Sequence, residues 1–298
     1  MVVAPVDTTV PSKPMKKTMP DIASSNSTVA PNNFEVVNKI RNAAEAIQFL
    51  DGADSLEFIQ DCKRKMRALC PALPGQHVLD VGCGVGQEVR TLATAVGAQG
   101  RVVGVDLGEA IIGEARQRFA ASGLPVEFRV GNAGGLDFPD DSFDLSRAER
   151  VIEYVDDPRA MLAEMVRVVR PGGSVLLFDF DYRGSIVDAS DRVLSARIDQ
   201  MVIASVPNGE IGAQLPRLCR AVGLENIRVL PQVYSVPFFV YEAMTKSAMQ
   251  DAVAAGTLSA EEFRRWWDEL ETAERNRQFF ATFSGFVVTG RKPGAARR

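Results

Sequence analysis

The stretch VLDVGCGVG, residues 78–86, decides the fold of this 298-residue chain. A short apolar strand runs directly into a turn with glycine at positions 82, 84 and 86. Glycine meets two needs of such a turn, because it tolerates positive φ angles and lets a ligand approach the backbone closely. In open α/β sheets, ligands bind beyond the carboxyl ends of the strands. The stretch therefore predicts a ligand site at the end of a parallel strand.

The spacing of the three glycines separates this turn from a dinucleotide fingerprint. That fingerprint reads Gly-x-Gly-x-x-Gly, whereas Gln87 occupies the position of its third glycine. Asp80, two residues before the turn, is a poor neighbour for a pyrophosphate because like charges repel. A carboxylate at this position suits a ligand that carries positive charge, such as an α-ammonium group. A nucleotide-dependent oxidoreductase is the competing enzyme class, and both residues argue against it.

Short apolar strands alternate with amphipathic helices downstream of the turn. This alternation predicts a parallel sheet with helices on both faces. Asp106 ends the second strand, where Rossmann-type sites place an acidic residue on ribose hydroxyls. Strands are expected at residues 77–81, 101–106, 126–130, 143–148, 174–179, 227–233 and 285–289, helices at 86–96, 109–122, 158–169 and 211–221, and a turn at 171–173.

The remaining segments flank this alternation. Residues 1–33 are rich in Pro, Ser, Thr, Val and Asn and show no periodicity, which predicts a disordered tail. Residues 34–70 contain two expected helices, at 42–50 and 55–69, which form a helical cap. The expected main domain spans residues 71–290, with residues 182–208 and 241–280 as cap insertions, and a basic tail follows at 291–298.

Composition narrows the function classes. The formal net charge of −4 gives no electrostatic footprint for nucleic acid. Four cysteines without a Cys-x-x-Cys pair, together with one histidine, do not supply a Cys/His metal site, so no metal is expected. A Ser-His-Asp hydrolase could be built only around His77, which precedes the first strand.

No apolar run approaches the ~18 residues of a membrane span, and without a secretory signal the cytoplasm is the expected location.

Residues 76–179 resemble the class I S-adenosylmethionine-dependent methyltransferases, in particular the branch with the ubiquinone and menaquinone C-methyltransferases. The matching pieces are LDVGCGVGQ, VVGVDLGEAII, FRVGNAGGLDFPDDSFD, the stretch to VDDP, and EMVRVVRPGG. The resemblance implies a Rossmann-like, seven-stranded, mostly parallel α/β sheet with helices on both faces and a helical cap. It also implies S-adenosylmethionine as cofactor and S-adenosylhomocysteine as its product, whereas the substrate does not follow from it.

The resemblance also implies the cofactor-binding residues, position by position. Asn132 stands where the family commonly has Asp, and its amide oxygen can still accept a hydrogen bond from adenine. The family often has His-His after the fourth strand, whereas this chain has Glu153-Tyr154, which puts histidine-assisted deprotonation in question. The implied set is Asp80, Gly82, Gly84 and Gly86 around the methionine part, Asp106 on the ribose, Leu107 and Ile111 beside the adenine, Asn132 followed by Ala133 at its amino group, and Ala148 and Glu149 beside the methionine.

Carboxylates and tyrosines near the strand ends are the candidates for a catalytic base. A base is needed only if the methyl acceptor must lose a proton. The candidate catalytic residues are Asp179 and Asp181 after the fifth strand, and Glu153 and Tyr154 after the fourth. For the two aspartates the alternative is a turn with solvated side chains. Arg147 is expected in a structural ion pair rather than on an anionic acceptor.

The expected function is methylation, on carbon or oxygen, of a small lipophilic or natural-product-like molecule, without nucleic acid as a partner. The apolar run VPFFVY, residues 236–241, fits the wall of a hydrophobic pocket, with burial in an ordinary core as the alternative. Trp266 and Trp267 indicate the core of the second insertion. A second function class stays open, in which the chain keeps the cofactor but works as a cyclase or scaffold. The oligomeric state is also left open.

Overall fold

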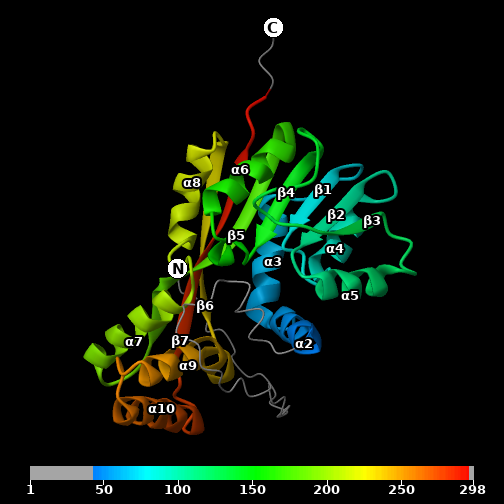
Figure 1. Ribbon diagram of the computed structural model, residues 1–298. Helices are drawn as coiled ribbons and strands as arrows, with labels where there is room; N and C mark the ends of the chain where they lie inside the picture. The colour runs from blue at the N-terminus through cyan, green and yellow to red at the C-terminus, as the bar shows by residue number, and fades with distance from the viewer. Residues whose placement is uncertain (1–42, 295–298) are drawn as a thin grey trace, which may run out of the picture.

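The computed structural model describes residues 43–294 as one mixed sheet flanked by helices (Figure 1). Its strand order is β3-β2-β1-β4-β5-β7-β6. The strands are β1 (His77–Val81), β2 (Arg101–Asp106), β3 (Val126–Val130), β4 (Phe143–Glu149), β5 (Val169–Val187), β6 (Glu225–Ser235) and β7 (Ala281–Arg291). Strands β1 to β5 pair in parallel, whereas β7 runs antiparallel to both β5 and β6. This topology confirms the expected Rossmann-like, seven-stranded, mostly parallel sheet.

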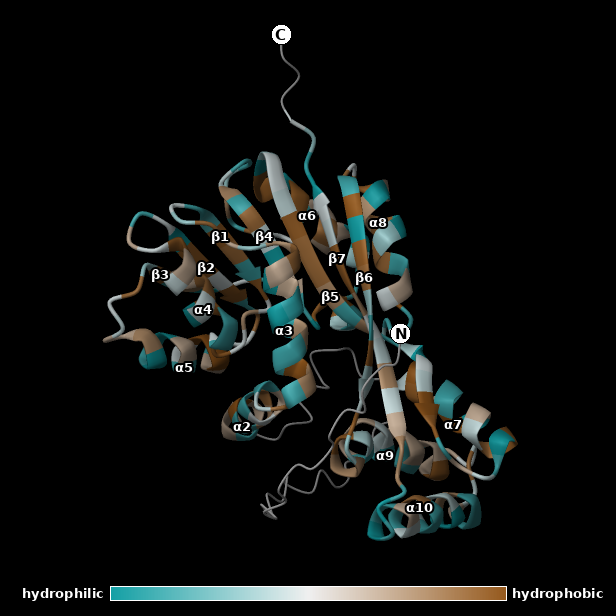
Figure 2. Cartoon of the chain, turned by 180° about the vertical axis from the view of Figure 1, so that it is seen from behind, coloured by the Kyte–Doolittle hydropathy of each residue, from teal (hydrophilic) through white to brown (hydrophobic). Residues whose placement is uncertain are grey.

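Helices cover both faces of the sheet. Helices α3, α4 and α5 pack on one face, and α6 and α8 pack on the other. The central part of strand β5, residues 175–180, is buried and mostly hydrophobic (Figure 2), as expected for a strand covered on both sides. The helices are α2 (Ala43–Asp54), α3 (Glu57–Leu69), α4 (Gln87–Val96), α5 (Glu109–Phe119), α6 (Pro158–Val168), α7 (Arg192–Ser205), α8 (Leu215–Ala221), α9 (Phe238–Ala254) and α10 (Ala260–Arg275), with short 3-10 helices η1 (Ile152–Tyr154) and η2 (Gly212–Gln214).

Strand β1 shows how the sequence produces this sheet. Val78 packs into the core on one face of the sheet and Leu79 into the core on the other. Both side chains are fully buried, because alternate residues of a strand point to opposite faces. Asp80 interrupts the apolar run, yet it is only 3% exposed. A buried carboxylate needs a partner, which makes this position part of the candidate site.

Strands β5, β7 and β6 extend beyond the rest of the sheet and carry a helical lobe (Figure 1). Strand β5 pairs with β7 from Ser174 to Val187, with a register shift between Asp181 and Ile186. Helices α7, α9 and α10 pack against this extension. Because the extension begins where the parallel strands end, the lobe lies beside the carboxyl ends of β4 and β5.

Several expected element boundaries are wrong. The fifth strand was expected over residues 174–179 and the seventh over 285–289, but both are longer, because their mutual pairing continues into the lobe. The turn expected at 171–173 is an irregular part of β5, with Gly172 at φ +80°. The helix expected at 211–221 is divided into η2 and α8. The helix expected at 109–122 ends at Phe119.

The insertions are helical, as expected, but their apolar residues form core. Val240 and Tyr241 are buried, whereas Phe239 is half-exposed, so the run at 236–241 opens helix α9 and faces the lobe interior on one side. Trp266 and Trp267 are both buried, which confirms their reading as core. The tail expected at residues 1–33 lies outside the described residues. Across residues 43–294, no helix combines the length and apolar character that a membrane crossing requires.

Candidate functional site

The glycine-rich turn lies between β1 and α4, at the carboxyl end of the middle one of the five parallel strands. Gly82, Gly84 and Gly86 have φ angles of +69°, +55° and +86°, a region that L side chains adopt at a cost. A Cβ atom added to Gly82 would lie 2.3 Å from Cγ2 of Val151, so this position excludes any larger residue. The backbone N–H of Gly82 donates to the carbonyl of Val105 at 2.7 Å, which ties the turn to β2.

Asp106 connects the turn to the end of β2. Its Oδ2 accepts a hydrogen bond from Gly84 N at 3.0 Å, and its Oδ1 accepts one from Gly108 N at 3.1 Å. Burial raises the pKa of Asp106, while these backbone donors lower it. A carboxylate oxygen has more than one acceptor site, so both oxygens retain capacity for ribose hydroxyls. Next to it, Leu107 is 47% exposed at the strand end, as a side chain contacting a ligand would be.

The residues implied for adenine lie along the same edge of the sheet. Ile111 is buried beside Val85 and helix α2. Asn132 uses its Oδ1 to accept from Gly134 N at 2.8 Å, which fixes the orientation of its amide and leaves one lone pair of that oxygen. Ala133, the next residue, is half-buried. Together with Leu107, these three positions keep their implied roles as predictions.

Helix α2 covers the glycine-rich turn, a contact that the sequence does not reveal. A Cβ atom on Gly84 would lie 3.5 Å from Cδ1 of Leu50. Asp51 fixes the helix, because its two carboxylate oxygens accept hydrogen bonds from the Arg118 guanidinium at 2.7 and 2.8 Å. The Arg118 guanidinium holds the pKa of Asp51 below its ordinary value. The expected helical cap therefore closes over the turn from the side of α5.

Arg147 forms the centre of a buried ion-pair network, which confirms its expected structural role. Its guanidinium donates to Asp80 at 3.2 Å and to Glu149 at 2.8 Å. The three side chains are between 2% and 8% exposed. The positive charge beside Asp80 thus comes from the protein itself. Burial raises the pKa of Asp80 to about 6 even though Arg147 lowers it.

Glu149 and Arg150 provide the structural test of whether the residues fit a cofactor with an amino-acid end. Burial opposes ionisation of Glu149, but Lys63, Arg150 and Arg147 lower its pKa below the ordinary value. Its Oε1 and the Nε of Arg150 face each other at 3.5 Å, and neither has a hydrogen-bond partner among residues 43–294. This ion pair leaves a carboxylate oxygen and a guanidinium N–H without hydrogen bonds, groups that can bind an ammonium and a carboxylate. The donor set therefore fits the methionine end of S-adenosylmethionine, through Glu149 more directly than through Asp80.

Glu153 is the centre of a second cluster, where η1 follows the carboxyl end of β4 and lies beside Asp179 in the middle of β5. It is 1% exposed, and Tyr182 and Tyr154 donate hydrogen bonds toward its carboxylate. Burial raises the pKa of Glu153 to about 7. Its Oε2 has no partner among the described residues. A carboxylate with a pKa near neutrality and a free oxygen can take up a proton at physiological pH.

The two aspartates of β5 differ from each other. Asp179 is fully buried, and its Oδ1 accepts from Glu153 N at 3.1 Å; burial and the neighbouring Glu153 raise its pKa. Asp181 does not join this cluster, because Arg183 and the backbone N–H of Ala213 occupy its carboxylate at 2.9 Å. Neither side chain is solvated in a turn, since both are almost fully buried. Asp179 supports η1, and Asp181 fixes Arg183 on the same strand and the 3-10 helix η2.

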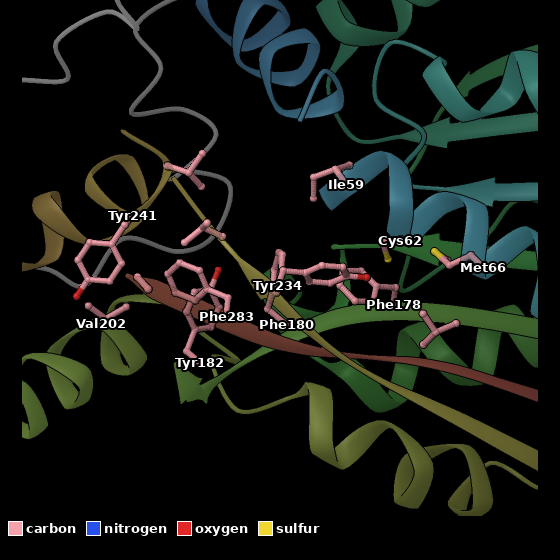
Figure 3. Close-up of a cluster of buried hydrophobic side chains, with 14 of the residues drawn as sticks. Ile59, Cys62, Met66, Phe178, Phe180, Tyr182, Val202, Tyr234, Tyr241 and Phe283 are labelled. Carbon is pink, nitrogen blue, oxygen red and sulfur yellow. The ribbon is translucent and has the colours of Figure 1, made fainter. Parts of the chain in front are cut away.

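An aromatic wall on β5, β6, β7 and α9 connects this cluster with the lobe. It consists of Phe178, Phe180, Tyr182, Tyr234, Tyr241 and Phe283, with neighbouring ring centroids 5.2 to 6.4 Å apart. Helix α3 faces its first part with Ile59, Cys62 and Met66 (Figure 3). Sequence reasoning named Tyr182 among the residues that follow the fifth strand, but it missed Tyr234 and Lys63 as site residues. Of these, only Lys63 could have been found from the sequence, because a lysine on the apolar side of a helix is unusual.

Comparisons with known proteins agree with this geometry. A family profile described as "Methyltransferase domain" matches residues 78–173. An uncharacterised 37.1 kDa protein in transposon TN4556 of Streptomyces fradiae is 33% identical over 253 residues, which are 82% of this chain and 70% of that protein. Demethylmenaquinone methyltransferase of Bacillus cereus is 41% identical over 107 residues, covering 36% of this chain and 45% of the enzyme. The match thus spans about half the length of that methyltransferase.

The fold is also similar to solved structures. The YcgJ protein from Bacillus subtilis superimposes with a TM-score of 0.57 at 19% identity, covering 79% of this chain and all of that chain. At this level of identity the likeness shows the fold alone.

Proposed function

The chain belongs to the class I S-adenosylmethionine-dependent methyltransferase family, and from this premise we propose that it methylates a small lipophilic molecule at the carboxyl ends of β4 and β5. S-adenosylmethionine supplies an electrophilic methyl group. The glycine-rich turn, Asp106 and the pair Glu149–Arg150 would hold this cofactor. The aromatic wall would hold the acceptor. We propose a cytoplasmic location as well, since all four cysteines are free, which is usual in a reducing compartment.

The observation that carries the proposal is the position of Glu153. Its free Oε2 and its pKa of about 7 equip it to remove a proton from an acceptor hydroxyl or an acidic carbon. Tyr154 and Tyr182 orient the carboxylate, and Asp179 fixes the backbone of Glu153. The neighbouring aromatic rings are almost fully buried, which keeps water away from Glu153 and favours transfer to the acceptor over hydrolysis.

Transfer of labelled methyl groups tests the proposal. The purified chain is incubated with methyl-labelled S-adenosylmethionine and a panel of lipophilic phenols, quinols and polyketide-like alcohols. Label in an acceptor product supports the proposal. Cofactor binding without transfer to any acceptor, accompanied by turnover of a polyene to a ring, would favour the cyclase alternative.

Asp106→Asn is expected to weaken the binding of S-adenosylhomocysteine. The amide keeps the size of the side chain but removes the charge, and a hydrogen bond to a charged group contributes about 1.5–3 kcal/mol. Calorimetric titration of the variant measures the change. Asp137→Asn, at an exposed position beyond β3, is the control and should leave the affinity unchanged. Equal affinities in wild type and Asp106→Asn would contradict the assignment of the ribose site.

A further inference from the structure

The loop that follows helix α7, residues 206–209, binds the segment that carries Glu153. The backbone N–H of Asn208 donates to the carbonyl of Glu153 at 3.0 Å. The side-chain Nδ2 of Asn208 donates to the carbonyls of Ile152 at 3.0 Å and Val155 at 2.7 Å. An asparagine amide has two N–H donors, so both of them are used in these bonds. One loop residue thus satisfies three carbonyl groups in and next to η1.

Helix η1 needs such contacts because it is a single turn of three residues. A helix end leaves carbonyl groups without partners inside the helix, and the closing bond of η1, from Val155 N to the carbonyl of Ile152, is 3.4 Å long. On the other side, Oδ1 of Asp179 accepts from Glu153 N at 3.1 Å. Asp179 and Asn208 therefore fix the two peptide groups that flank the side chain of Glu153.

The same loop also fixes the tyrosine that donates toward Glu153. The backbone N–H of Tyr182 donates to the carbonyl of Gly209 at 2.9 Å, and the Tyr182 hydroxyl donates toward the carboxylate of Glu153. The ring of Tyr182 packs against Phe180 and Phe283, with centroids 6.1 and 5.9 Å away (Figure 3). Two consecutive loop residues thus determine where the base and its hydrogen-bond donor lie relative to each other.

We propose that Asn208 is a positioning residue for methyl transfer, which places the carboxylate of Glu153 beside the hydroxyl of Tyr182 by binding the carbonyl groups of η1. This inference rests on the proposed function, because it takes Glu153 as the base. Asn208 acts through the backbone of η1 and takes no part in the proton transfer itself. A reacting group that is misplaced by about 1 Å can cost on the order of 10²-fold in rate, so the loss of the two amide bonds should slow the reaction.

A titration of Glu153 tests this placement without any acceptor. The full chain is produced with glutamate labelled at its side-chain carboxyl and followed by NMR, and the resonance that is missing from Glu153→Gln identifies Glu153. The charged and titratable groups that face it are Arg150 and Tyr154 of its own segment and Asp179 and Tyr182 of β5.

Asn208→Ala should raise the pH midpoint of this titration above the wild-type value of about 7. Hydrogen bonds to an ionised carboxylate lower its pKa, and in the variant the carboxylate moves away from the hydroxyl of Tyr182. We expect a rise of about one pH unit, as for the loss of a single weak hydrogen bond. Asn208→Gln keeps both amide donors on a longer side chain, so it should shift the midpoint in the same direction by less.

A double-mutant cycle tests the effect on the reaction. We expect Asn208→Ala to lower kcat about tenfold and to bind S-adenosylhomocysteine as wild type does. In a Glu153→Gln background the same substitution should not lower kcat further, because the group that Asn208 positions is already absent. A role in folding alone would lower kcat by the same factor in both backgrounds. Asn276→Ala, at an exposed position at the end of α10, is the control and should match wild type throughout.

The outcomes separate this proposal from the proposed function. An Asn208→Ala variant that binds S-adenosylhomocysteine normally and keeps the wild-type midpoint of Glu153 would overturn the positioning role, as would equal losses of kcat in the two backgrounds. If Asn208→Ala does not fold, Asn208→Gln decides by the same measurements. If the midpoint rises but wild type methylates no acceptor, the placement of Glu153 by Asn208 is supported although the proposed function fails.

Discussion

Replacement of Arg147 by methionine is expected to destabilise the fold by about 3–5 kcal/mol, the cost of leaving buried charges without their partner. Arg147 is the cation shared by Asp80 and Glu149, and all three side chains are almost fully buried. Methionine approximates the length of the arginine stem, so the variant removes mainly the charge and the two donors. Urea unfolding followed by circular dichroism measures the change in the free energy of unfolding.

The pH dependence of this variant provides a second readout. Without Arg147, the pKa of Asp80 should rise further above its wild-type value of about 6. A carboxyl whose pKa is raised in the folded state stabilises the fold below its unfolded pKa, and this contribution is lost as the pH rises through the folded pKa. Arg147→Met should therefore regain stability as the pH is lowered from 8 toward 5.5.

Arg64→Met is the matched control. Arg64 pairs with Glu57 and Asp61 on the exposed side of α3, and exposed pairs contribute little because water and salt screen them. The free energy of unfolding of the Arg64→Met variant should stay close to that of wild type. If both variants unfold at the same urea concentration, the network around Arg147 does not hold the strand ends together.

Glu153→Gln is expected to lower kcat by about 10²–10⁴-fold, the usual contribution of a general base, with a smaller change in KM. Glutamine keeps the shape of the side chain and its contacts with the tyrosines, but it cannot take up the proton that the methyl acceptor loses. The measurement uses the acceptor found with labelled methyl groups. Glu210→Gln, at an exposed position, should retain wild-type kcat. A Glu153→Gln variant with undiminished kcat would remove Glu153 from the mechanism.

The pH profile of wild type follows from the same residue. A base must be ionised to act, so kcat/KM should rise with pH and level off above the pKa of about 7. Stability should change in the opposite direction. Because the folded-state pKa exceeds the ordinary value of 4.5, the contribution of Glu153 to stability is lost as the pH rises from about 4.5 to 7. Glu153→Gln should lack both of these changes.

The parts of the fold that could be predicted from the sequence are those specified by local patterns. The turn at 78–86 required glycine at three positions, and the structure shows positive φ angles at all three. Strands β1, β2 and β3 begin and end where their apolar runs do. Strands β1 and β2 are buried on both faces, so their composition alone separates them from the neighbouring helices, whereas β3 is an edge strand with alternating apolar and charged residues.

Long-range contacts account for what the sequence did not reveal. The extension of β5 depends on its pairing with β7, about a hundred residues later in the chain, and no local pattern encodes that register. The shared role of Arg147 depends on β1 and β4 lying side by side, with Asp80 opposite Arg147. Asp179 and Asp181, two residues apart, have different partners because η1 approaches one of them and η2 approaches the other.

Calorimetric titration of the wild-type chain with S-adenosylmethionine, S-adenosylhomocysteine and NADH tests the central claim most directly. The arrangement of the glycine-rich turn, Asp106 and the pair Glu149–Arg150 predicts binding of the first two in the micromolar range and no binding of NADH. Binding of NADH without binding of either sulfur compound would contradict the methyltransferase assignment and favour an oxidoreductase.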